Sequence, residues 1–112
     1  MGDKSKKAIA DVKVCKEECK HTLTRLRELE AISKQQGTSP EGYRAREEYY
    51  KALTTLNFAV EKLYGKTKTL ADLIVAKEQE TNLLKKKSLS ALKKTHAGAI
   101  QLIDACRAIG HK

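Results

Sequence analysis

The side chains best suited to chemistry are three cysteines and the histidines near them in the sequence. Cys15 and Cys19 stand at positions i and i+4, so a helix would place both thiols on one face. Thiolates and imidazoles bind zinc, and His21 or His96 would complete such a site if the fold brought it close. No CxxC or HxxxH spacing supports this reading. We therefore interpret the cysteines as buried thiols and predict no metal.

Catalysis has no recognisable basis in this sequence. The phosphate-binding GxxxxGK[ST], the dinucleotide-binding GxGxxG, the nucleophile motif GxSxG and the zinc motif HExxH are all absent. Long helices also offer few loops on which an active site is assembled. We predict no enzymatic activity, no catalytic residues, no cofactor and no small-molecule substrate.

A basic stretch, LLKKKSLSALKK, is the first candidate for partner binding. It contributes Lys85, Lys86, Lys87, Lys93 and Lys94. Such a face attracts polyanions whatever their sequence, so nucleic acid or an anionic membrane is one possible partner. No RNA-binding aromatic motif accompanies it. The ordinary alternative is a solvated helix face.

The second candidate is a group of aromatic residues within residues 40–77, which hold all four tyrosines and the single phenylalanine. At about 100° per residue, Tyr49 falls in the apolar stripe, whereas three other tyrosines form a row on one shoulder of the helix. We call Tyr43, Tyr50 and Tyr64 the aromatic row. It could pack against a second neighbouring helix or bind a partner. Phe58 lies nearly opposite the stripe, which predicts an exposed binding residue.

Three helices are predicted to position these residues. Apolar or small residues recur in alternating steps of four and three over residues 4–36, and again over residues 40–77. Gly37 suits the end of the first helix, and Ser39 with Pro40 suits the start of the second. Gly65 interrupts the second seam without changing its phase, so we expect one continuous helix. A third helix is predicted over residues 82–109 after a turn near residues 78–82.

These elements predict one all-α domain over residues 1–112, an antiparallel up-down-up three-helix bundle with coiled-coil packing like that of spectrin repeats. In such a bundle the first and third helices run parallel. Cys106 would then lie near the far end of the first helix from Cys15, which excludes it as a third ligand. His96 would lie near the level of Thr22, which leaves open only a weak site with Cys15 and Cys19. Monomer and weak homodimer are both compatible with such seams.

Charge and hydropathy bound the environment. The formal net charge is +9, and no apolar run approaches the roughly 18 residues that a membrane span needs. The N-terminus lacks a secretory signal, and Lys6 replaces the Ser or Thr of a myristoylation motif. An odd number of cysteines fits a reducing compartment. We expect a soluble intracellular protein.

The start of the second helix resembles tubulin-binding cofactor A, a family in which this helix opens with Tyr followed by basic and acidic residues. The residues that carry the resemblance are Pro40, Tyr43, Arg44, Arg46, Glu47 and Glu48, with Lys13, Lys16, Glu17 and Glu18 in the first helix. Glu41 and Gly42 are inserted between Pro40 and Tyr43, Ala45 replaces an aliphatic residue or Lys, and the family's Gln is missing. Beyond Leu56 only length and helix layout match.

The resemblance implies a cytoplasmic, cytoskeleton-associated chaperone that binds β-tubulin during folding, without catalysis or cofactor. On this reading the partner-binding residues are Tyr43, Arg46, Glu47, Tyr50, Phe58, Tyr64, Lys85, Lys86, Lys87, Lys93 and Lys94. Acidic tubulin would meet a basic bundle favourably. Two alternatives stay open: a BAG-like regulator of Hsp70, whose third helix is also basic at its start, and a nucleic-acid or anionic-membrane binding module.

Overall fold

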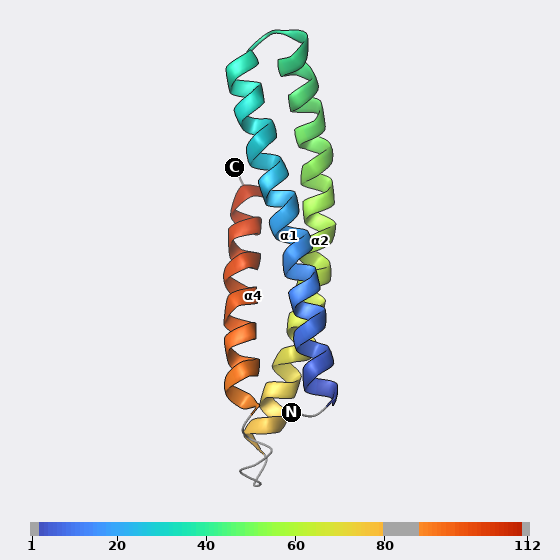
Figure 1. Cartoon of the computed structure of the whole chain (residues 1–112), viewed down its shortest axis with the longest axis vertical. Coiled ribbons are helices and arrows are strands. Elements are labelled where there is room, and N and C mark those ends of the chain that lie inside the picture. Colours follow the sequence, from blue (N-terminus) through green and yellow to red (C-terminus); the bar gives the residue numbers. More distant parts are fainter. Residues whose placement is uncertain (1–2, 80–87, 111–112) are drawn as a thin grey trace.

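Three helices make up the described part of the chain. The computed structural model describes residues 3–79 and 88–110. Helix α1 spans Asp3–Gln36, α2 spans Pro40–Glu78 and α4 spans Leu89–Gly110. They run up, down and up around a common core (Figure 1), and no strand occurs within the described ranges. The predicted all-α antiparallel three-helix bundle is confirmed.

The connection between α1 and α2 uses the predicted capping residues. Gly37 has a φ of 53°, which side chains rarely tolerate, and its N–H donates to the Ser33 carbonyl at 3.1 Å. Ser39 caps α2, because its hydroxyl oxygen accepts a hydrogen bond from the Gly42 N–H at 3.2 Å. Pro40 follows as the first helical residue. Both helix ends therefore lie where the sequence places them.

The core consists of the residues that form the heptad seams. Cys19 of α1, Leu63 of α2 and Leu92 of α4 are completely buried. Around them one apolar cluster extends along the bundle, and burial of this surface is the main stabilising contribution. Helix α2 continues through Gly65 without interruption, as its unbroken seam predicts.

The segment that is not described, residues 80–87, lies in the sequence between the end of α2 and the start of α4. Gln79 closes α2 with a backbone hydrogen bond from its N–H to the Val75 carbonyl at 3.3 Å. Ser88 lies in a turn, and its carbonyl accepts the N–H of Leu92 at 3.1 Å. The predicted start of the third helix at residue 82, most of the predicted turn, and Lys85 to Lys87 lie outside the described residues.

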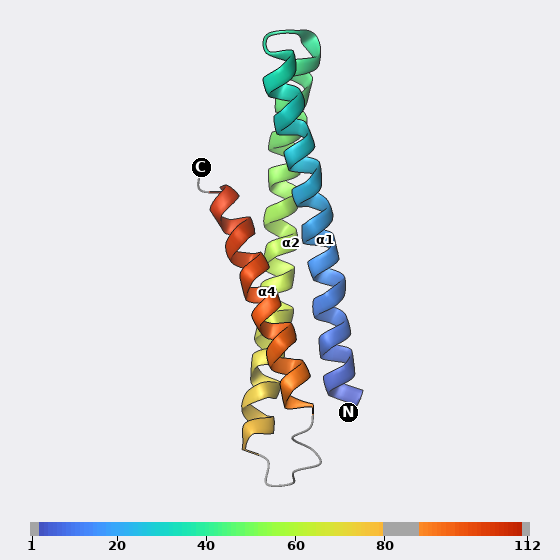
Figure 2. The ribbon, with the colours of Figure 1, turned by 60° about the vertical axis from the view of Figure 1, so that its left-hand side comes forward.

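Helix α4 is much shorter than the hairpin against which it packs. It has 22 residues, whereas α1 has 34 and α2 has 39. Its C-terminal end stops partway along the hairpin, and α1 and α2 continue together beyond it (Figures 1 and 2). We call this two-helix part, residues 26–36 and 40–55, the α1–α2 extension. The described molecule is accordingly long and narrow, 64 × 22 × 18 Å.

The position of α4 along α1 differs from the sequence-based expectation. The Cys106 and Cys19 side chains are neighbours in the core, so Cys106 lies near the middle of α1 and not at its far end. Thr95 and Ala97, the neighbours of His96 in the chain, line a groove together with residues 6–16 of α1, so His96 lies at the level of these residues and not at the level of Thr22. Both expectations were wrong because α4 is short and lies beside the N-terminal half of α1. It ends before it reaches the C-terminal half of α1.

Candidate partner-binding surfaces

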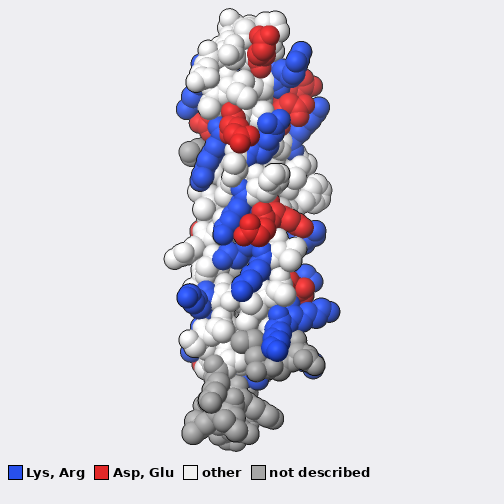
Figure 3. Space-filling model, in the orientation of Figure 1, with Lys and Arg blue, Asp and Glu red and all other residues white. Residues whose placement is uncertain are grey.

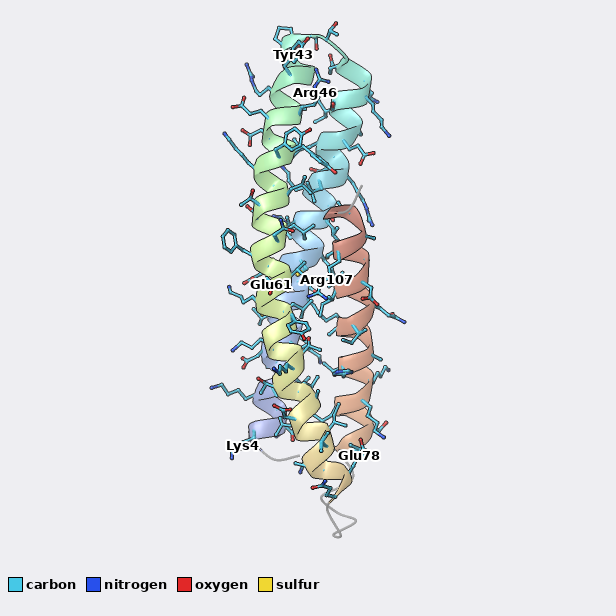
Figure 4. The ribbon with its side chains drawn as sticks, turned by 180° about the vertical axis from the view of Figure 1, so that it is seen from behind. Lys4, Tyr43, Arg46, Glu61, Glu78 and Arg107 are labelled. Carbon is cyan, nitrogen blue, oxygen red and sulfur yellow. The ribbon has the colours of Figure 1, made fainter. Side chains whose placement is uncertain are left out.

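The aromatic row begins at the tip of the hairpin, beside the α1–α2 connection. Tyr43 is 59% exposed, and the Arg46 guanidinium lies 4.6 Å from the centre of its ring. Arg46 also donates to the Ser33 hydroxyl at 3.1 Å and to the Gly37 carbonyl at 3.0 Å. Figure 4 shows both side chains at this end of the molecule. Arg46 therefore holds the connection in place and orients Tyr43, while Glu47 points to solvent.

The second tyrosine of the row lies on the α1–α2 extension, where no α4 covers the hairpin. Tyr50 is 68% exposed and meets Tyr49 edge to face, with ring centres 6.1 Å apart. Tyr49 and Leu53 continue the apolar seam of α2, yet both remain only half-buried. These residues occupy the side of α2 against which α4 packs lower in the bundle. The extension therefore presents an apolar seam that lacks a third helix.

Tyr64, the third member of the row, lies where α4 is present. It is 44% exposed, and the Arg107 guanidinium lies 5.1 Å from its ring centre. Arg107 also forms an ion pair with Glu61 at 4.0 Å, and Figure 4 shows these two residues reaching toward each other between α2 and α4. Tyr64 thus packs at the second helix contact, which was the alternative role considered for the whole row. Only Tyr43 and Tyr50 are free of α4.

Phe58 is exposed, as its position opposite the apolar stripe predicts. Its side chain is 74% exposed, the highest value among the large hydrophobic residues of the described chain. It borders a shallow groove of about 320 Å³ between α1 and α2, which Thr22 and Ala59 also line. An ion pair between Lys62 and Glu18, 3.5 Å apart, crosses this groove. Phe58 therefore lies on a different side of α2 from the interface with α4.

The two predicted lysines that the structure describes, Lys93 and Lys94, do not form one surface with the aromatic row. Lys93 pairs with Glu78 of α2 at 4.0 Å, near the base of the bundle. Glu78 is fourteen residues from Tyr64, which corresponds to about 20 Å along the helix. Lys94 instead faces α1. Lys85, Lys86 and Lys87 lie outside the described residues.

A basic groove between α1 and α4 is the feature that the sequence did not indicate. Its volume is about 850 Å³. Its lining residues are Lys6, Ile9, Ala10, Lys13, Lys16, Ala91, Lys94, Thr95, Ala97, Gly98 and Gln101. Lys and Arg predominate over this lower part of the molecule in the view of Figure 3. The recurrence of Lys6, Lys13 and Lys16 beside the apolar seam of α1 could have predicted one side of this groove. The side formed by α4 was not predictable, because it depends on how far α4 is shifted along α1.

The cysteines form a buried group within the core. Burial raises the pKa of Cys19 to about 12, and burial is also the main cause of the raised pKa of Cys15 and Cys106. These thiols are therefore protonated and poor nucleophiles near neutral pH. Within the described ranges, no cluster of three or more His, Cys, Asp or Glu side chains is placed to hold a metal ion.

Comparison of the chain with family models, with curated proteins and with solved structures finds no match. Of the helices that the structure describes, none combines the length and apolar character required to cross a lipid bilayer.

Proposed function

We propose that this chain is a non-catalytic binding protein that holds β-tubulin on its folding route, with the α1–α2 extension as its main contact. The partner comes from the resemblance to tubulin-binding cofactor A. The observation that carries the choice of surface is the position of Tyr43 and Tyr50, exposed on the part of the hairpin that α4 leaves uncovered.

The physical support is the large exposure of these rings. Tyr43 has a cation–π contact with Arg46 and Tyr50 meets the edge of Tyr49, yet both tyrosines stay more than half exposed. Large aromatic side chains left in water are unfavourable for a free monomer, and buried aromatic anchors supply most of the binding energy in protein interfaces. An apolar element of the partner laid along the extension would cover both rings and complete the burial of Tyr49 and Leu53.

Charge gives secondary support for this partner. The chain carries a formal net charge of +9, and tubulins are acidic. Complementary charge mainly increases the association rate and fixes orientation, so it would assist an apolar contact without replacing it. We therefore expect the complex to form more slowly, but to persist, when the salt concentration is raised.

Binding of purified β-tubulin to the immobilised chain tests the proposal. The variant Tyr43→Ser with Tyr50→Ser removes the two rings, whereas Val14→Ser with Val75→Ser removes two exposed apolar side chains elsewhere on the surface. We expect at least tenfold weaker binding for the tyrosine pair and less than about twofold for the valine pair, since hot-spot residues typically contribute 2 kcal/mol or more. Equal losses of binding in the two double variants would exclude the α1–α2 extension as the main contact with β-tubulin.

Hsp70 is the second candidate partner, favoured by the basic sequence LLKKKSLSALKK, whose last six residues begin α4. The same immobilised chain should be exposed to purified Hsp70. Binding of Hsp70 with no binding of β-tubulin would replace the proposed partner by the BAG-like alternative.

A further inference from the structure

We infer that the basic groove between α1 and α4 docks an acidic amphipathic helix of a partner protein. The inference rests on the groove alone and does not require that the partner be β-tubulin. It concerns a different side of the molecule from the aromatic row.

The first observation is that the lysines of the groove lack carboxylate partners. Most charged side chains elsewhere along the bundle are paired: Lys62 with Glu18, Lys66 with Asp11 and Lys93 with Glu78. Among the described residues, none of the four groove lysines, Lys6, Lys13, Lys16 and Lys94, forms an ion pair, and no Asp or Glu lines the groove. Four like charges around one groove repel one another, and an anionic occupant would relieve that repulsion.

The second observation is that the groove lining between the lysines, which we call the floor, is mostly apolar and mostly small. Ile9 and Ala10 of α1 and Ala91, Ala97 and Gly98 of α4 line it, and Thr95 and Gln101 are its polar members. Gly98 leaves room for the Lys16 side chain, whose Nζ atom lies 3.0 Å from the position that a Cβ on Gly98 would occupy. Small side chains let a third element approach closely, because the distance between packed helices depends on the side chains at the contact.

The spacing of the lysines suits a helix. Lys6 and Lys13 are seven residues apart on α1 and Lys16 follows about one turn later, so the three lysines span about 15 Å along the groove. Lys6 and Lys13 edge the α1 side, whereas the Lys16 amine reaches across to Gly98 of α4. Lys94 lies on the opposite side, on α4. A docked helix of about ten residues would span this length, with small or apolar residues on the floor and glutamates or aspartates along both edges. Opposite charges at such flanking positions set partner choice in helical bundles.

Other occupants fit these observations less well. A phosphate backbone would satisfy the lysines but would leave the alanine floor exposed to water, whereas a helix covers it. A second copy of this chain carries the same net charge of +9, so it would add repulsion. The combination of an apolar floor with unpaired amines at both edges therefore favours an acidic amphipathic helix.

A designed peptide provides the probe. It is a fluorescein-labelled helical peptide of about 18 residues with alanine and leucine on one face and glutamates along both edges of that face, and its control has glutamine in place of every glutamate. The full-length protein should bind the acidic peptide at least tenfold more tightly than the glutamine peptide, as measured by fluorescence anisotropy. Equal affinity for the two peptides would overturn the inference.

Two matched double variants locate the binding. Lys13→Glu with Lys94→Glu reverses groove charges, and Lys7→Glu with Lys68→Glu makes the same change in net charge at exposed residues outside the groove. We expect at least a tenfold loss of acidic-peptide affinity in the first and less than a threefold loss in the second, with unchanged circular dichroism in both. Similar losses in both variants would show that only the net charge of the protein matters, and would refute the groove as the binding site.

Blocking the floor separates a docked helix from a polyanion. Ala97→Phe places a ring in the groove while every lysine stays, so affinity for the acidic peptide should fall at least fivefold. Binding of a single-stranded oligonucleotide, which needs only the charges, should change less than twofold. Undiminished binding of the peptide by this variant, or binding of the oligonucleotide more tightly than the peptide, would refute docking of a helix.

Discussion

At the residue scale, Phe58 illustrates how helical periodicity predicts the exposure of a single side chain. Its angle from the apolar stripe predicts exposure, and the structure confirms this prediction with 74% of the side chain exposed. An exposed ring gains little from folding. We expect Phe58→Ala to lower the free energy of unfolding by less than about 1 kcal/mol in urea denaturation, against the 3–5 kcal/mol typical of a buried Phe. A loss in the buried range would contradict the exposed position.

The buried thiols should make the free energy of unfolding decrease as the pH rises into the alkaline range. Burial raises the pKa of Cys19 from 9.0 to about 12. The unfolded chain therefore loses this proton near pH 9 while the native chain keeps it, so stability decreases as pH rises from about 9 to about 12, by about 1 kcal/mol per pH unit for this thiol. Urea denaturation at pH 8, 9 and 10 checks this. Cys19→Ala should be less stable at pH 8 but should show a shallower decrease.

The residue scale also shows where the sequence is insufficient. The burial of Cys15, Cys19 and Cys106 was predictable, since all three lie on apolar seams. That Cys106 contacts Cys19 was not, because the periodicity of a helix fixes which face is buried and not how far the helix slides along its neighbour. Contacts between side chains on different helices depend on that register.

At the element scale, the boundaries marked by capping residues were the most predictable. Gly37, Ser39 and Pro40 locate the end of α1 and the start of α2, because each has a backbone or side-chain role that few other residues fill. The boundary before α4 has no Gly or Pro to mark it. Its predicted start at residue 82 falls outside the described residues.

Two helical glycines have opposite roles, and the same substitution should distinguish them. A Cβ on Gly65 meets no atom within 4 Å, so Gly65→Ala should raise the free energy of unfolding by about 0.5–1 kcal/mol through lower backbone entropy in the unfolded chain. A Cβ on Gly42 would collide with the carbonyl oxygen of Gly37 in the α1–α2 connection. Gly42→Ala should therefore destabilise by about 1–3 kcal/mol.

Each glycine variant serves as the control for the other in chemical denaturation. A neutral or stabilising Gly42→Ala would contradict the close approach of α2 to the end of α1, and a destabilising Gly65→Ala would contradict the open surroundings of Gly65.

At the scale of the whole molecule, the architecture was predictable and the candidate binding surfaces were predictable only in part. Three seams with short connections allow few arrangements other than an up-down-up bundle. The aromatic row was visible in the sequence, but its division into Tyr64 beside α4 and Tyr43 with Tyr50 beyond it follows from the length and register of α4. The basic groove likewise exists only once Lys94 lies opposite Lys13.

The elongated shape leads to a prediction for scattering in solution. The Cα radius of gyration is 18.1 Å, whereas a compact domain of this length has about 13 Å. Small-angle X-ray scattering of a monomer should give a value near the larger figure, slightly increased by hydration. A value near 13 Å would contradict the elongated bundle with its α1–α2 extension. An increase of the radius of gyration with protein concentration would identify the weak homodimer.

The uncovered extension should also be the least stable part of the fold. Local opening free energy follows the apolar surface that an element buries, and the α1–α2 extension continues beyond the C-terminal end of α4, whereas the rest of the hairpin lies beside α4. We expect backbone amides of the extension to exchange with deuterium at least tenfold faster than amides around Leu63, measured at neutral pH by mass spectrometry. Binding of the proposed partner along Tyr43 and Tyr50 should remove this difference, because it supplies the missing third element. Uniform exchange along α2 in the free protein would show that the hairpin unfolds as one unit, and protection confined to residues near α4 would place the contact elsewhere.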